Sequence, residues 1–282
     1  MRVSKRAQAV PPSATMAVSA RAKELKSQGI DVVSFGAGQP DFDTPEFIKQ
    51  AAIKAMEAGD TKYTATPGVI ELRKAISEKL KKENGLSYST SQVIVNIGAK
   101  HSVYESMQAI LDSGDEVILP TPHWVTYPEA IKLTGATPKV VQTDPENKYK
   151  LTPDELKNAM TDKTAMLLLN SPNNPGGFRY TPDELKAIAK VLEGTDVMVV
   201  SDEIYEKLVY GDTEFVSFAA LSDDTYKRTV TINGFSKAFA MTGWRLGFTA
   251  GPEEVIQAMG RLQSHMTQNA VAFVQQAGIA AY

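Results

Sequence analysis

Lys237 and Arg245 lie eight positions apart in the run N-G-F-S-K-A-F-A-M-T-G-W-R-L-G, residues 233–247. The neighbours of Lys237 are small or apolar, which predicts a partly desolvated amine. Loss of solvent disfavours the ammonium form and lowers the pKa of a lysine, so this amine could act as a Schiff-base nucleophile. The planar guanidinium of Arg245 is suited to bidentate recognition of a phosphate, and Gly243 could let the backbone approach a bound group.

Polar residues also follow apolar stretches that we expect to be strands, and the ends of such strands are where open α/β sheets bind ligands. The three stretches are L-L-L-N-S-P-N-N-P-G-G at 167–177, V-V-S-D-E-I-Y-E at 199–206 and T-I-N-G-F-S-K at 231–237. A buried carboxylate at Asp202 is costly without a partner, although an aspartate at a strand end can also cap a helix. Tyr205 lies three residues later, on the same face if the segment turns helically.

The run G-F-S-K-A-F-A-M-T-G-W-R-L-G resembles, position for position, the pyridoxal-phosphate attachment signature of class I aminotransferases, which have fold type I. The three strand-end stretches resemble motifs of the same family in the expected chain order, and bacterial-type aspartate aminotransferases are the most similar subgroup. The resemblance implies a pyridoxal 5′-phosphate enzyme that transfers an amino group between an amino acid, aspartate in the first instance, and a 2-oxo acid of the 2-oxoglutarate/glutamate pair. The internal aldimine would form on Lys237.

The resemblance assigns catalytic roles to three residues. Lys237 would carry the cofactor and move protons, Asp202 would keep the pyridine nitrogen protonated, and Tyr205 would hydrogen-bond the phenolic oxygen. Asn174 would contact that oxygen and the substrate α-carboxylate, although Gly176 stands where the family usually has threonine. The other residues that the resemblance assigns to cofactor binding are Arg245, Trp124, Ala99, Lys100, Tyr63 and Ser236.

The segment V-I-V-N-I-G-A-K-H-S, residues 93–102, predicts a strand that passes through a glycine into a helix, whose free N–H groups could bind an anion. The resemblance implies that the Ala99 and Lys100 amides cradle the cofactor phosphate opposite Arg245. The Lys100 side chain would either meet the distal carboxylate of a substrate or remain an exposed lysine. The substrate-binding residues implied by the resemblance are Gly38, Trp124, Asn174 and Lys100.

Helical and apolar patterns alternate along the chain and predict an α/β fold with a mainly parallel seven-stranded sheet covered by helices on both faces. We expect residues 1–44 to form an N-terminal arm and part of an incomplete small domain, and residues 45–282 to form the large cofactor-binding domain. The expected helices are 45–58, 69–84, 99–112, 153–160, 182–193 and 252–266, and the expected strands are 92–96, 116–119, 138–142, 164–170, 196–201, 228–233 and 246–250.

Local signals refine the helix ends. The hexapeptide T-P-D-E-L-K occurs at 152–157 and at 181–186, and each copy predicts a capping box at a helix start. Thr44 and Pro45 predict a further start, with Thr44 as the capping residue. Ser13 is expected to cap an N-terminal helix that ends at Gly29, and 31–35 are expected to form a short strand.

Composition limits the partners. The net charge of −3 argues against nucleic-acid binding, and no apolar stretch approaches the length that spans a bilayer. The chain has no cysteines, and its three histidines show no metal-ligand spacing, so no metal site is expected. We expect a soluble cytoplasmic protein. Tyr63 matches a tyrosine that reaches the phosphate of a neighbouring subunit, so the resemblance implies a homodimer with active sites at the interface.

The family continues for roughly another hundred residues, a length typical of a small domain. That part supplies an arginine for the substrate α-carboxylate, whereas no arginine follows Arg261 here. We therefore expect a chain truncated relative to the family, without the C-terminal small-domain segment. Two alternatives to the transaminase hypothesis stay open: another fold type I enzyme, a lyase or a synthase, and a truncated cofactor-binding form with little turnover.

Overall fold

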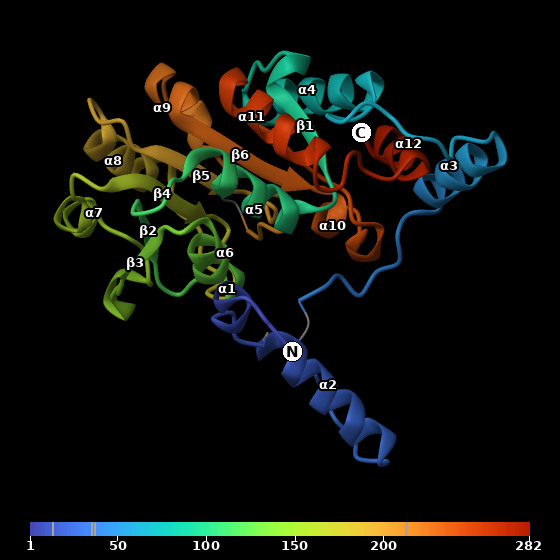
Figure 1. The fold of residues 1–282 in the computed structure, drawn as a ribbon, viewed down its shortest axis with the longest axis horizontal. Helices are drawn as coiled ribbons and strands as arrows, with labels where there is room; N and C mark the ends of the chain where they lie inside the picture. Colours follow the sequence, from blue (N-terminus) through green and yellow to red (C-terminus); the bar gives the residue numbers. More distant parts are fainter. Residues whose placement is uncertain (13, 35, 37, 212–213) are drawn as a thin grey trace.

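The computed structural model describes residues 1–12, 14–34, 36, 38–211 and 214–282. In this part of the chain, α-helices and strands alternate from residue 70 to residue 264 (Figure 1). The strands are β1 (Val93–Asn96), β2 (Glu116–Pro120), β3 (Thr137–Val141), β4 (Thr164–Asn170), β5 (Met198–Asp202), β6 (Thr229–Gly234) and β7 (Gly247–Ala250). The α-helices are α1 (Lys5–Gln8), α2 (Ala14–Ser27), α3 (Glu46–Glu57), α4 (Ile70–Asn84), α5 (Ala99–Ile110), α6 (Thr126–Thr134), α7 (Pro153–Ala159), α8 (Pro182–Leu192), α9 (Asp223–Arg228), α10 (Phe235–Ala238), α11 (Glu253–Ser264) and α12 (Ala272–Ala281).

The seven strands form one mixed sheet in the order β1-β7-β6-β5-β4-β2-β3. Strands β2 to β6 pair in parallel, whereas β7 runs antiparallel to both β1 and β6. The mainly parallel sheet that the sequence predicts is therefore confirmed. The chain between β6 and β7 doubles back instead of crossing over the sheet, which is why β7 has the opposite direction.

Gly234 and Gly247 are paired across β6 and β7 and close this β6–β7 loop. A β-carbon on Gly234 would lie 2.8 Å from the Cα of Gly247, and one on Gly247 would lie 2.6 Å from the amide nitrogen of Ala99. Only glycine fits at these contacts. The loop that carries Lys237 and Arg245 thus starts and ends directly beside the beginning of α5.

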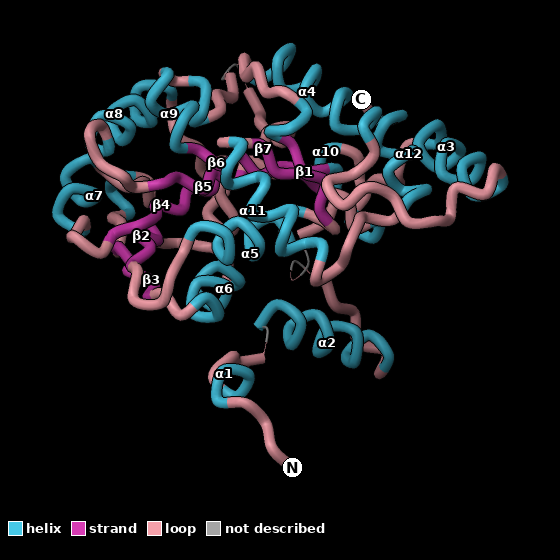
Figure 2. Tube along the Cα trace, turned by 45° about the horizontal axis from the view of Figure 1, so that its top comes forward, coloured by secondary structure: helices cyan, strands magenta, loops and turns pink. Residues whose placement is uncertain are grey.

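Helices cover both faces of the sheet (Figure 2). Side chains from successive residues of β4 pack on opposite sides of it. Leu168 of β4 belongs to a buried cluster with α5 and α6, whereas Leu167 and Leu169 belong to a cluster with α7 and α8. Each fully buried leucine stabilises the fold by about 1.5–3 kcal/mol. A third cluster joins α3, α4 and α12 to the β1–β7 end of the sheet. Burial on two faces explains why β4 is apolar at five consecutive positions, 165–169.

The first two helices lie apart from the sheet, and α2 projects away from the body of the molecule (Figure 1). All residues from 1 to 12 are exposed. The predicted strand at 31–35 is wrong for 31–34, which form no strand, and Phe35 lies outside the described residues. A strand pattern needs a neighbouring strand to pair with, and this segment lies outside the sheet. The predicted cap Ser13 also lies outside the described residues.

The helix starts agree with the sequence in two places and differ in a third. Thr152 and Thr181 both form the capping boxes expected from T-P-D-E-L-K. At α3, however, Pro45 occupies the capping position, and no side chain makes a capping hydrogen bond there. The prediction that Thr44 caps this helix is therefore wrong. None of the helices in the described part of the chain has both the length and the apolar character that a bilayer crossing needs.

Candidate active site

Asp202 is the last residue of β5, and only 3% of its surface is exposed. Burial raises the pKa of its carboxyl to about 6, while hydrogen bonds from Tyr127 and from the backbone of Ile204 oppose the shift. The Tyr127 hydroxyl donates to Oδ2 at 2.7 Å, and the Ile204 N–H donates to Oδ1 at 3.2 Å. The carboxyl group that the sequence selects is thus desolvated, fixed in direction and close to its ionisation point at neutral pH.

Two residues that sequence reasoning did not select support Asp202. The Tyr127 side chain is buried in α6, and its hydroxyl contacts the carboxylate directly. Asn170 ends β4 opposite Asp202 in the sheet, donates to the Asp202 carbonyl at 2.9 Å and accepts from the backbone N–H of Asn174 at 2.8 Å. Tyr127 stands in the run T-P-H-W-V-T-Y-P, three positions after Trp124, and its nearness in sequence to that predicted residue was the available signal.

Lys237 lies in the short helix α10 after β6, and its side chain is half-buried. Burial lowers the pKa of its amine, and the charge of Arg245 lowers it further. The amine donates to the Gly38 carbonyl and lies 5.9 Å from the centre of the Tyr205 ring. Ser236, beside Lys237, is buried. The structure thus brings Gly38, Tyr205 and Arg245 around the amine of Lys237, whose lowered pKa favours the unprotonated, nucleophilic form.

The Tyr205 hydroxyl accepts a hydrogen bond from the Asn174 side-chain amide at 3.1 Å. Burial raises the pKa of Tyr205, and the Asp202 carboxylate raises it further. Gly176 stands where the family usually has threonine, and the structure explains the glycine: a β-carbon there would lie 2.6 Å from the Phe178 ring. Phe178 therefore occupies space beside the loop while Asn174 retains its contact with Tyr205.

A cradle for an anion forms where the β6–β7 loop meets α5. Gly98 precedes α5 with φ at +93°, and no side chain caps the helix amides that begin at Ala99. A β-carbon on Gly98 would lie 2.5 Å from Nη2 of Arg245, so glycine permits the guanidinium to pack here. Arg245 donates from Nη1 to the Thr242 carbonyl at 2.8 Å and from Nη2 to the Ile97 carbonyl at 3.4 Å. Helix amides and a guanidinium side by side favour a phosphate.

A buried hydrogen-bond network centred on Asn96 fixes the start of α5. The Asn96 amide at the end of β1 donates to Glu105 at 2.6 Å and to Gln263 at 2.8 Å. Its oxygen accepts from Ser102 at 2.8 Å and from Thr249 at 2.9 Å. Burial raises the pKa of Glu105 to about 8, against the opposing hydrogen bond from Asn96. All four hydrogen-bonding positions of Asn96 are used, so β1, β7, α5 and α11 are held in one arrangement.

Two further predicted residues, Lys100 and Trp124, lie next to each other. The Lys100 amine lies 4.8 Å from the centre of the Trp124 ring, and Trp124 packs edge-on against Tyr127 with centroids 5.4 Å apart. Burial and then the Arg245 charge lower the pKa of Lys100. Tyr63 is different. It lies in the loop between α3 and α4 with 84% of its surface exposed, and the described contacts do not join it to the other predicted residues.

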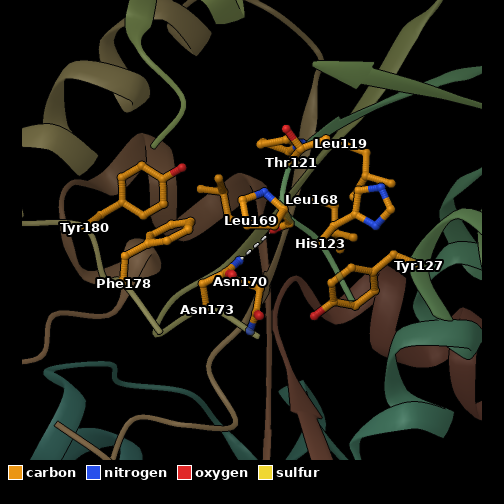
Figure 3. A pocket seen from close by; sticks show the side chains of 12 residues that line it. Leu119, Thr121, His123, Tyr127, Leu168, Leu169, Asn170, Asn173, Phe178 and Tyr180 are labelled. Carbon is orange, nitrogen blue, oxygen red and sulfur yellow. Dashed lines mark hydrogen bonds between the residues drawn. The ribbon is translucent and has the colours of Figure 1, made fainter. Parts of the chain in front are cut away.

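A small void of about 10 Å³ lies behind the site, between the loop after β2 and the end of β4 (Figure 3). This volume is enough for about one water molecule. Asn173 closes one side, because its side-chain amide donates to the Pro122 carbonyl at 3.2 Å. The contact joins the loop that carries Asn174 to the loop that carries Trp124. The void therefore belongs to the support of the site and is too small to hold a substrate.

The fold and the site together define an α/β protein with an amine, a buried carboxylate and an anion cradle at one edge of a mixed sheet. The family model for aminotransferase class I and II matches residues 30–282. This chain therefore belongs to the aminotransferase class I and II family.

Individual relatives agree with that assignment. The aspartate aminotransferase of Bacillus subtilis (strain 168) is 50% identical over 282 residues, which are 100% of this chain and 72% of the relative. The solved structure of aspartate aminotransferase from Thermus thermophilus with maleate is 45% identical with a TM-score of 0.96, covering 100% of this chain and 73% of that one. An aromatic aminotransferase from Pyrococcus horikoshii OT3 is 43% identical with a TM-score of 0.86, covering 92% of this chain and 69% of that one.

Proposed function

We propose that this chain uses pyridoxal 5′-phosphate to transfer the amino group of aspartate to a 2-oxo acid of the 2-oxoglutarate/glutamate pair. The observation that carries the proposal is the group around Lys237. A partly desolvated amine lies 5.9 Å from the ring centre of Tyr205, and the Tyr205 hydroxyl accepts from Asn174. A lysine with a lowered pKa is the nucleophile that an aldehyde cofactor requires.

The residues present fit this cofactor at both of its ends. The N–H groups of Ala99 and Lys100 and the guanidinium of Arg245 would bind its phosphate, in the cradle that Gly98 leaves open. Asp202, buried at the end of β5, would bind its ring nitrogen. Tyr205 and Asn174 would hydrogen-bond its phenolic oxygen, Ser236 would support the phosphate site beside Lys237, and Trp124 would stack on its ring. When bound, the cofactor supplies an aldehyde for amines and a ring that withdraws electrons from the carbon beside them.

The chain's own residues would manage the protons. Lys237 Nζ would accept the α-proton of the amino acid as a base and then, as an acid, deliver it to the carbon that was the cofactor's aldehyde carbon, for which its lowered pKa is suited. The Asp202 carboxylate would hold a proton on the ring nitrogen, and Tyr127 would keep that carboxylate in place through its 2.7 Å hydrogen bond. Asn174 and the Gly38 amide would orient the substrate α-carboxylate.

Aspartate as donor is supported by two positively charged side chains that lie near each other, Lys100 and Arg245. Lys100 lies over the Trp124 ring, and Arg245 is close enough to lower its pKa. A second carboxylate on the substrate would find a cation here, whereas an aromatic side chain would not need one. Several relatives are named aspartate/prephenate aminotransferase or probable members of that type, so prephenate is tested beside 2-oxoglutarate as the 2-oxo acid that accepts the amino group from aspartate.

We also propose that residues 1–44 act as an arm and a small-domain portion beside the cofactor-binding domain of residues 45–282, and that two chains form a homodimer. Tyr63 is almost fully exposed, and the helices on either side of it expose further apolar side chains, Phe47 and Met56 of α3 and Ile70 of α4. Such a group is typical of a protein interface. Light scattering of the purified protein tests this, and a monomer that still transaminates would contradict the placement of Tyr63 at a shared site.

The substitution Lys237→Ala tests the proposed function. We expect the parent protein to bind pyridoxal phosphate with visible absorbance and to convert aspartate and 2-oxoglutarate, and the variant to lose both the covalent absorbance and the transfer. Lys186→Ala is the matched control, because that lysine is an exposed residue of α8. Turnover of aspartate by Lys237→Ala at the parent rate would rule out the proposal.

The same assay separates the alternatives. Amine transfer that depends stoichiometrically on the 2-oxo acid distinguishes a transaminase from a lyase or synthase. A parent protein whose absorbance appears with pyridoxal phosphate but does not respond to aspartate would be a cofactor-binding form without turnover.

A further inference from the structure

Thr44 has a role that its place before α3 does not explain. Its surface is 5% exposed, and its hydroxyl points away from the helix start to the β6–β7 loop. The hydroxyl donates to the Ala240 carbonyl at 2.7 Å and accepts from the Trp244 indole N–H at 3.1 Å. One buried oxygen therefore joins two points of the loop that lies about 200 residues later in the chain.

The loop that Thr44 contacts contains two residues in an unfavourable backbone conformation. Ala240 has φ at +53° and Arg245 has φ at +55°, and neither is glycine. The left-handed conformation costs a residue with a side chain about 1–2 kcal/mol, and it persists where neighbouring contacts impose it. Arg245 acquires its direction toward Gly98 from this conformation. The loop therefore needs external contacts to keep Arg245 in place.

Four hydrogen bonds join the segment 38–44 to this loop. Thr44 binds both Ala240 and Trp244, the Thr242 hydroxyl lies 3.3 Å from the Gln39 side-chain oxygen, and the Gly38 carbonyl accepts from Lys237. Among these contacts, those of Thr44 are partly buried, whereas the other two are exposed. Breaking a hydrogen bond away from solvent is costly, because each group is left without its partner and without full access to water.

We propose that Thr44 is a positioning residue for the anion cradle: its hydroxyl holds residues 240–245 in the conformation that directs Arg245 to Gly98 and the start of α5. The inference rests on the proposed function, in which Arg245 binds the cofactor phosphate. Valine at position 44 keeps the volume of threonine but leaves the Ala240 carbonyl and the Trp244 N–H without their partner. Serine keeps the hydroxyl and serves as the matched control.

The experiment compares two ligands on the cofactor-free protein. Dissociation constants for pyridoxal 5′-phosphate and for pyridoxal, which lacks the phosphate, are measured by equilibrium dialysis for the parent, Thr44→Val and Thr44→Ser. Two lost hydrogen bonds predict that Thr44→Val weakens pyridoxal phosphate binding by about tenfold. Binding of pyridoxal should stay close to that of the parent, and Thr44→Ser should bind both ligands nearly as the parent does.

A third variant covers the case in which Thr44→Val fails to fold. Trp244→Phe removes the indole N–H together with the five-membered ring that carries it, and it keeps the contact of Thr44 with Ala240, so it should show a smaller loss that is again restricted to pyridoxal phosphate. Unchanged binding of pyridoxal phosphate in the folded variants would overturn the inference, as would an equal loss for both ligands, which indicates general loosening. A parent protein with no preference for the phosphorylated ligand would contradict the proposed role of Arg245 itself, and the inference would fail with it.

Discussion

Asp202 and Arg245 lie in two regions that are held in different ways. Asp202 ends a central strand, where parallel pairing to β4 and β6 sets its position and burial fixes its two hydrogen-bond partners. Arg245 is exposed, lies in a loop with φ at +55°, and depends on contacts from residues far away in the sequence. The proposed ring-nitrogen partner Asp202 is therefore held by the sheet itself, whereas the proposed phosphate ligand Arg245 is held in a loop by contacts from other parts of the chain.

This difference predicts two classes of variant. Changes at the strand-end region should lower kcat while cofactor affinity is kept, because the sheet holds the rest of the site in place. Changes in the loop region should lower cofactor affinity first. The following substitutions test the division, in order of expected effect.

Asp202→Asn should have the largest effect. The amide keeps the size of the side chain but cannot hold a proton on the ring nitrogen, so kcat for aspartate should fall roughly a hundredfold to a thousandfold, as for the loss of a preorganised charge. Steady-state kinetics together with cofactor titration measure this, and Asp202→Glu is the control that retains the charge. A fall in cofactor affinity with kcat unchanged would contradict the prediction that Asp202 acts on turnover and not on cofactor binding.

Arg245→Lys should come next. Lysine retains the charge but loses the planar pair of donors, and a charge-assisted hydrogen bond contributes about 1.5–3 kcal/mol. We expect pyridoxal phosphate to dissociate roughly tenfold to a hundredfold more readily, with kcat restored when the cofactor is saturating. If a saturating concentration of cofactor does not restore kcat, changes in the loop also affect turnover, and the predicted division between the two regions is wrong.

Tyr127→Phe should have a smaller effect, which pH makes visible. The Tyr127 hydrogen bond lowers the pKa of Asp202, which burial raises to about 6, so its loss should raise that pKa further. A carboxylate with a higher pKa needs a higher pH to ionise, and the acidic limb of the kcat profile should therefore move to higher pH, with kcat about tenfold lower near neutrality. An unchanged pH profile would show that Tyr127 does not act through Asp202.

Glu105→Gln should change stability more than activity. The pKa of Glu105 is raised by burial from 4.5 to about 8, so between these pH values the folded protein keeps a proton that the unfolded chain releases. The free energy of unfolding of the parent should thus fall as pH rises through this window. The glutamine variant should lack this contribution and gain stability relative to the parent between pH 5 and pH 8. Urea unfolding at several pH values measures the difference, and a constant difference would contradict the buried, protonated state of Glu105.

The sequence predicts the strand-end region better than the loop region, for a physical reason. All seven strands and the capping boxes at Thr152 and Thr181 follow from local patterns, because periodicity and capping act within a few residues. The helices α6 and α9 and the antiparallel direction of β7 were not predicted, since they depend on which elements pack together. The sequence predicts that the Thr44 hydroxyl caps α3, whereas in the structure it makes no capping hydrogen bond and instead binds a loop 200 residues away.

The residues that support Asp202 could not be predicted from the sequence either. Tyr127 contacts Asp202 from α6 and Asn170 contacts it from the neighbouring strand β4, and a single sequence gives neither the helix packing nor the strand register that places them. Lys237, Asp202 and Arg245 could be selected because their residue types are unusual for their apolar or glycine-rich surroundings. The contacts that position them could not.

The most direct test of the central claim is chemical. The protein is loaded with pyridoxal phosphate, reduced with borohydride to fix any lysine-bound cofactor, digested and analysed by peptide mass spectrometry. We expect the pyridoxyl phosphate mass on the peptide that contains Lys237, and its disappearance in Lys237→Ala. Labelling of Lys100 or of surface lysines, with Lys237 unmodified, would contradict the assignment on which the whole site depends.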